Sequence, residues 1–106
     1  MSYEPIRIYG FLSAAPDSMA HALARGFDLT ELDYKDGDLT LEFEGKYFFL
    51  DDLMEAIAPH LRPETTGRLD YIDHDEWTMT RFKFKDGAYT MVKVNLNDVL
   101  ERYSHE

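Results

Sequence analysis

Two Asp-Gly pairs, at 36–37 and 86–87, each lie between stretches in which apolar and polar residues alternate. Alternation with a period of two is typical of a half-buried strand. An Asp-Gly pair between two such strands favours a two-residue type I′ turn. The sequence therefore predicts two tight β-hairpins, at about 27–44 and 78–94, and these two units constrain the fold more than any other feature.

The position of each turn sets the register of its hairpin. In the first hairpin, one predicted face is apolar and the other carries mostly carboxylates, with the facing pairs Lys35 and Asp38, Asp33 and Thr40, and Glu31 and Glu42. In the second hairpin, Phe82 is expected to face Met91. Trp77, Met79 and Val94 share the opposite face with basic residues; we expect them to be core beneath a helix, the alternative being a homodimer or partner face.

The remaining segments predict an α+β domain that spans 1–106. We expect an antiparallel sheet of about five to six strands with two or three helices mainly on one face, in the order β-α-β-β-α-β-β-β-α. The additional elements are a strand at Ile6–Leu12, a helix after Pro16 that ends at Gly26, a helix from Phe49 or Leu50 to Pro59, a strand at Arg68–Ile72 and a C-terminal helix capped by Asn95.

The order begins like a ferredoxin-like βαββαβ unit, and it also fits a tandem hairpin–helix repeat. Residues 34–41 align with 84–91, and residues 50–55 align with 96–101. A duplication and the independent convergence of ordinary turn and helix-start chemistry both explain this likeness. The analogy of fold carries no function.

Composition excludes several classes of function. The 106 residues contain no cysteine, so disulfides, cysteine zinc sites and thiol chemistry are excluded. The net charge of −10 disfavours direct contact with nucleic acid or an anionic membrane, because both would repel the protein. Without a leader-like start or a long apolar run, we expect a cytoplasmic protein.

The net charge is concentrated in the middle of the chain. Residues 28–76 contain 15 acidic and four basic residues, a balance of −11, whereas the remainder has six acidic and seven basic residues. Such a segment forms either a solvated surface or an anionic array that binds a basic protein partner. The candidate partner-binding residues are Glu31, Asp33, Glu42, Glu44, Asp51, Asp52, Asp73, Asp75 and Glu76.

Motifs for catalysis and cofactor binding are absent from the sequence, so we expect neither an enzyme nor a bound cofactor. The turn at Asp73, His74 and Asp75 gathers possible ligands for a divalent ion, but its spacing is not that of an EF-hand, and an ordinary polar turn explains it as well. His21 and His60 are expected to be surface or helix-end residues.

These features favour a small acidic protein-interaction module. One form of it is an inhibitor or DNA mimic that occupies the basic groove of a nucleic-acid-binding protein. Small anti-CRISPR and antirestriction proteins of phages and plasmids have this general composition. The alternative is a small enzyme or ligand-binding domain that uses a cleft between helix and sheet, with a divalent metal near His74. A structural dimer subunit of a larger assembly is a third reading.

Overall fold

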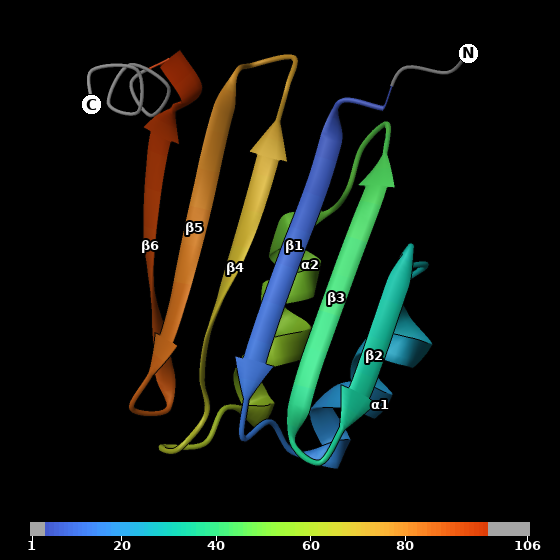
Figure 1. Cartoon of the computed structure of the whole chain (residues 1–106), viewed down its shortest axis with the longest axis vertical. Helices are drawn as coiled ribbons and strands as arrows, with labels where there is room; N and C mark the ends of the chain where they lie inside the picture. The colour runs from blue at the N-terminus through green and yellow to red at the C-terminus, as the bar shows by residue number, and fades with distance from the viewer. Residues whose placement is uncertain (1–3, 98–106) are drawn as a thin grey trace.

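The computed structural model describes residues 4–97, which form one antiparallel sheet of six strands with two α-helices behind it (Figure 1). A short 3₁₀-helix, η1, follows the second α-helix. In chain order the elements are β1 (Ile6–Ser13), α1 (Asp17–Gly26), β2 (Glu31–Lys35), β3 (Asp38–Gly45), α2 (Leu50–Ile57), η1 (Ala58–His60), β4 (Thr66–Asp73), β5 (Thr78–Lys85) and β6 (Ala88–Asn95).

The strands lie in the order β2-β3-β1-β4-β5-β6, so the first strand of the chain is at the centre of the sheet. β1 pairs with β3 on one side and with β4 on the other, and Ile8 faces both Phe43 and Tyr71. Each hairpin lies at one edge: β2 and β3 form one end of the sheet, and β5 and β6 form the other (Figure 1). The two edges therefore come from segments about fifty residues apart in sequence.

One face of the sheet and both helices enclose the core. α1 and α2 lie behind β2, β3, β1 and β4, whereas β6 extends past them (Figure 1). Burial alternates along β1, where Ile6, Ile8 and Leu12 face the helices. The other large core side chains are Leu39, Leu41, Leu69, Phe82 and Phe84 from the sheet and Met19, Leu23, Leu53, Met54 and Ile57 from the helices.

Local sequence explains where the helices begin and end. Asp17 and Asp51 lie in the first turns of α1 and α2, where the positive end of the helix dipole favours a carboxylate. α2 ends at Ile57, two residues before Pro59, which lies inside η1. Proline cannot donate the hydrogen bond that would continue the α-helix, so the chain tightens into a 3₁₀ turn.

The structure confirms an α+β fold with an antiparallel sheet, and it confirms the predicted registers of both hairpins. The element order differs from the predicted one, because η1 follows α2 and the described residues contain two α-helices. Most of the predicted C-terminal helix falls in residues 98–106, outside the described part. The ferredoxin-like relation and the internal duplication stay predictions.

One expectation about the core is wrong. Met79 and Val94 face each other across β5 and β6, but both are only half-buried, as is Trp77. Strand alternation places Met79 on the side opposite the buried Thr80 and Phe82, away from the core. The indole nitrogen of Trp77 donates a hydrogen bond to Asn97 at 2.7 Å.

Both tight turns have the backbone conformation that the Asp-Gly pairs predict. Asp36 and Gly37 have φ of 52° and 87°, and the second turn has φ of 56° and 78°, so both central residues are left-handed in each case. Replacing Gly37 with Val should lower the free energy of unfolding by about 1–3 kcal/mol, since a β-branched residue is strained at positive φ. Denaturant unfolding measures this, with Asp38→Val as the control; equal stability of Gly37→Val and the wild type would contradict it.

Candidate functional site

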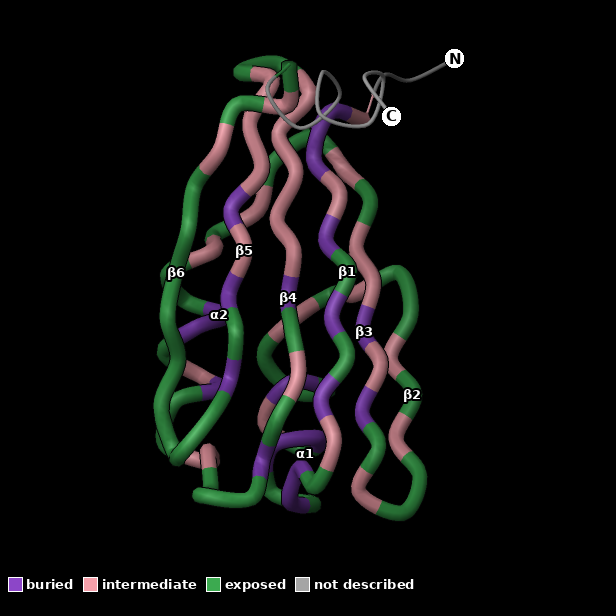
Figure 2. Tube along the Cα trace, turned by 60° about the vertical axis from the view of Figure 1, so that its left-hand side comes forward, coloured by how far each residue is buried: buried purple, intermediate pink, exposed green. Residues whose placement is uncertain are grey.

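The face of the sheet opposite the helices, here called the open face, carries side chains in an ordered sequence of charge. Strand alternation and pairing place the same kinds of residue in successive rows across it. One row runs Glu31, Glu42, Tyr9, Asp70, Arg81, Val92, and the next runs Asp33, Thr40, Phe11, Arg68, Lys83, Thr90. Acidic residues thus lie at one end, aromatic residues in the centre, and basic residues towards β5. Figure 2 shows how buried and less buried positions alternate along β1, in the middle of the sheet.

The acidic strip consists of Glu31 and Asp33 on β2 and Asp38, Glu42 and Glu44 on β3. Glu31 lies directly opposite Glu42, as the sequence predicts. Like charges in facing positions destabilise a strand pair, so this part of the sheet is retained at some cost in stability. Within residues 4–97, no ion pair forms on Glu31, Asp33 or Glu42.

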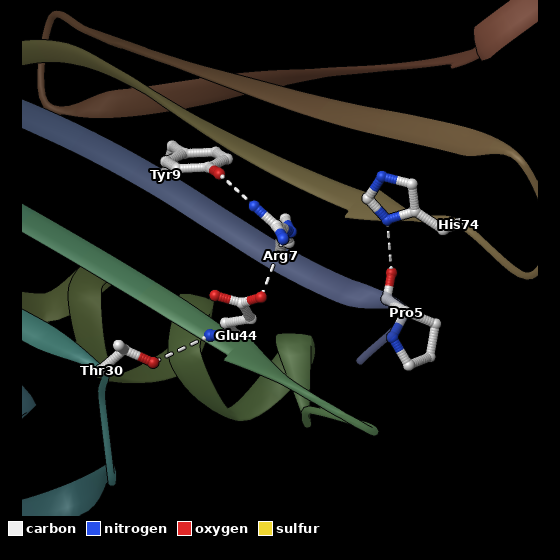
Figure 3. Close-up of polar contacts among 6 residues, drawn as sticks. All are labelled: Pro5, Arg7, Tyr9, Thr30, Glu44 and His74. Carbon is white, nitrogen blue, oxygen red and sulfur yellow. Dashed lines mark hydrogen bonds and ion pairs between the residues drawn. The ribbon is translucent and has the colours of Figure 1, made fainter. Parts of the chain in front are cut away.

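Glu44 differs from the other carboxylates of the strip because it is paired with a cation. Arg7 on β1 donates a hydrogen bond to the Glu44 carboxylate at 2.8 Å and another to the Tyr9 hydroxyl at 3.3 Å (Figure 3). The pKa of Arg7 is raised above its usual value, first by the hydrogen bond with Tyr9 and then by the negative charge of Glu44. The Glu44 backbone N–H donates to the Thr30 hydroxyl at 2.9 Å, which holds this strand end in place.

A basic strip lies on the same face, formed by Arg68 on β4 and Arg81, Lys83 and Lys85 on β5. Arg81 donates two hydrogen bonds to the Asp70 carboxylate, at 2.8 and 3.1 Å, and Arg68 lies 3.7 Å from the same group. Lys83 and Lys85 are exposed. The second hairpin alone predicts the alternation of these cations, but only the pairing of β1 with β3 and β4 brings them onto one face with the carboxylates.

The centre of the open face is aromatic and partly exposed. Tyr9 and Phe11 project from β1 with 42% and 49% of their surface accessible. Since β1 is the one strand between β3 of the acidic strip and β4 of the basic strip, these two rings lie between the charged regions. Aromatic side chains that are exposed between two charged regions are typical of a surface that binds another protein, where they supply most of the apolar contact.

The remaining predicted partner-binding residues lie elsewhere. Asp51 and Asp52 are exposed in the first turn of α2, behind the sheet. Asp73, Asp75 and Glu76 belong to the end of β4 and the connection to β5. The nine candidates therefore form three groups, and only the four on β2 and β3 share the open face.

The weak metal candidates at 73–75 are occupied by local hydrogen bonds. The Asp73 carboxylate accepts from the backbone N–H groups of Asp75 and Glu76, at 2.9 and 3.1 Å. His74 Nδ1 lies 2.8 Å from the Pro5 carbonyl, which can only accept, so this nitrogen carries the proton (Figure 3). No group of three or more metal-ligating side chains occurs in residues 4–97.

A shallow hollow of about 570 Å³ lies at the end of the open face, beside the Arg7–Glu44 pair. His74, Trp77 and Tyr9 also line it. A smaller depression, of about 230 Å³, lies beside Phe27, Phe48 and Asp52. The ligand-binding cleft between helix and sheet stays a prediction.

Comparisons with known proteins bring no further information about this surface. No protein-family model matches the chain, and searches of curated proteins and of solved structures also find no match. Neither helix in residues 4–97 has the length and apolar composition needed to span a bilayer.

The opposed carboxylates allow a direct test of the acidic strip. Glu42→Gln should raise the free energy of unfolding by about 0.2–1 kcal/mol, because it removes one of two like charges in facing positions. The gain should shrink as salt screens the repulsion. Chemical denaturation at low and high salt measures both effects. Glu55→Gln, which removes an exposed carboxylate of α2 far from β2, is the control. A loss of stability in Glu42→Gln would show that Glu42 makes a favourable contact.

Proposed function

We propose that this chain is a protein-interaction module whose acidic strip binds a basic groove on a nucleic-acid-binding protein. The observation that carries the proposal is the display of Glu31, Asp33 and Glu42 side by side on one sheet face, where the described residues form no ion pair with them. Carboxylates held opposite one another destabilise the free protein, and a basic partner would relieve that repulsion.

The spacing of these groups supports a decoy for nucleic acid. Alternate residues on a strand are about 6.5–7 Å apart, and neighbouring strands are about 4.8 Å apart. The strip thus presents a rigid lattice of negative charge to a groove that otherwise binds phosphates. Inhibitors of restriction or CRISPR nucleases carried by phages and plasmids are of this general type, and such a partner would put the protein in the cytoplasm of a bacterium.

The basic strip narrows the class of partner. A surface that fits the whole open face needs cations opposite β2 and β3, an apolar centre opposite Tyr9 and Phe11, and acidic groups opposite Lys83 and Lys85. A protein surface can meet all three demands, whereas a nucleic acid meets only the last. We therefore propose a protein partner and no direct contact with nucleic acid or membrane.

The test is competition between this protein and the nucleic acid of its partner. Capture from a bacterial lysate at low salt, followed by mass spectrometry, identifies candidates, each of which is then loaded with labelled nucleic acid. Wild-type protein should displace the label. Glu31→Lys with Glu42→Lys should bind at least about tenfold more weakly, since it reverses two charges that face the groove. Raised salt should weaken the wild-type interaction, because screening acts over about 8–10 Å.

A matched control separates local complementarity from net charge. Asp51→Lys with Asp52→Lys changes the net charge by the same amount but acts behind the sheet, so it should displace the label nearly as well as the wild type. If both double variants displace the labelled nucleic acid equally poorly, overall charge, and not the position of the acidic strip, explains the binding. If nucleic acid and this protein bind the partner together, the proposal is wrong.

The hollow beside His74 favours a second candidate function, the binding of a small ligand. It brings a guanidinium, two carboxylates, an imidazole and two aromatic rings to one place. Under this alternative a divalent ion would bind near His74. Calorimetry of the metal-free protein with Zn²⁺ or Mn²⁺ would show saturable binding that His74→Ala removes. We expect neither protein to bind the ions, because residues 4–97 contain no group of three or more metal-ligating side chains. We also expect His74→Ala to leave the fold and partner binding nearly intact, because it removes a single side-chain hydrogen bond, the one to Pro5.

A further inference from the structure

The outer edge of β6 has no strand beside it in residues 4–97. β6 runs for eight residues, and within the described part of the chain it pairs with β5 alone, which leaves the other side of its backbone without ladder hydrogen bonds there. Every residue from Ala88 to Lys93 is exposed. Unpaired N–H and C=O groups along a strand of this length are a template for another strand.

Hairpin geometry identifies the groups that point outward. Lys85 and Ala88 close the two-residue turn, and such a closing pair exchanges both backbone hydrogen bonds. Pairing then alternates along the strand, so Thr90 and Val92 direct their backbone groups towards β5. The outward N–H and C=O groups belong to Tyr89, Met91, Lys93 and Asn95.

β6 lacks the features that protect natural edge strands. It contains no proline and a single charged side chain, Lys93. Met91 and Val92 are 61% and 57% exposed, although both favour burial. The opposite edge of the sheet is different: β2 has only five residues, and every second one is charged. Short, charged edges resist pairing, and long, neutral ones permit it.

The distribution of charge favours a second copy of the chain as the source of the strand that pairs with β6. The acidic strip lies at the far end of the sheet, on β2 and β3. Two copies joined at β6 keep these strips at opposite ends, far beyond a screening length of about 8–10 Å. Their basic strips would be separated by two β6 strands, about 15 Å in all, so their mutual repulsion is also screened.

We propose that β6 pairs antiparallel with β6 of a second copy and joins two six-stranded sheets into one. We place the two-fold axis at Val92, because this register pairs every outward group, Met91 with the partner's Lys93 and Tyr89 with the partner's Asn95. An axis through a continuous sheet is perpendicular to it, so both open faces lie on the same side. The dimer then carries its two acidic strips at the far ends of the joined sheet, and the pairing does not rest on the proposed function.

The first test is the mass of the full chain in solution. Sedimentation equilibrium should give a dimer for the wild type at micromolar concentration. Met91→Pro removes one outward N–H without touching the bonds to β5, and it should raise the dimer dissociation constant by at least about tenfold. Met91→Thr retains the N–H and should remain dimeric. Dissociation of both variants alike would show that apolar contact, not strand pairing, holds the copies together and would overturn the proposal.

A cross-link tests the register and does not depend on the folding of the proline variant. The chain has no cysteine, so a single one reports cleanly. Facing residues of a non-hydrogen-bonded pair have Cβ atoms about 4.5–5.5 Å apart, close to the span of a disulfide. Val92→Cys should form a covalent dimer under mild oxidation, and Asp33→Cys on β2 should not. A monomeric wild type, or equal cross-linking of both variants, would overturn the proposal.

Discussion

The arrangement of side chains on the two faces of the sheet depends on the alternation of β1, which pairs with a strand on both sides. Its residues facing the helices, Ile6, Ile8 and Leu12, are buried, and those facing the other way include Arg7, Tyr9 and Phe11. A slip of one residue in either pairing would turn a neighbouring strand over and bury its charges. The register of β1 therefore decides at once which side chains form the core and which charges share the open face.

That dependence explains what the sequence could predict and what it could not. The Asp-Gly turns determine local pairings, so Glu31 opposite Glu42 and Phe82 opposite Met91 follow from short-range chemistry. The pairing of β1 with β3 and β4 joins residues at least 27 positions apart, and no local motif specifies it. For this reason the carboxylates of the first hairpin were predictable, but the Arg7–Glu44 pair and the basic strip beside them were not.

Gly67 is another feature that only the long-range pairing explains. It has φ of 148°, and a Cβ at this position would lie 2.1 Å from the Phe11 carbonyl oxygen. In the sequence it is an ordinary loop glycine beside Thr65 and Thr66. Its role becomes clear only when β4 lies against β1, where the absence of a side chain lets the two backbones approach. Thr65 supports the same junction by donating to the Ala14 carbonyl at 2.8 Å.

The two hairpins differ most in what their outer strands expose. Both close with the same turn and both lie at an edge, yet β2 carries charge at every second position, whereas β6 carries Tyr89, Met91 and Val92. Because edge strands with little charge tend to pair, the low charge of β6, whose single charged side chain is Lys93, needs an explanation that folding alone does not supply. Of the described residues, neither α1 nor α2 covers β6, whose side chains from Ala88 to Lys93 are exposed and could serve an intermolecular contact (Figure 1). The charged edge at β2 thus resists pairing with another strand, whereas the edge at β6 permits it. The strands between these two edges separate the negative charge from the proposed contact at β6.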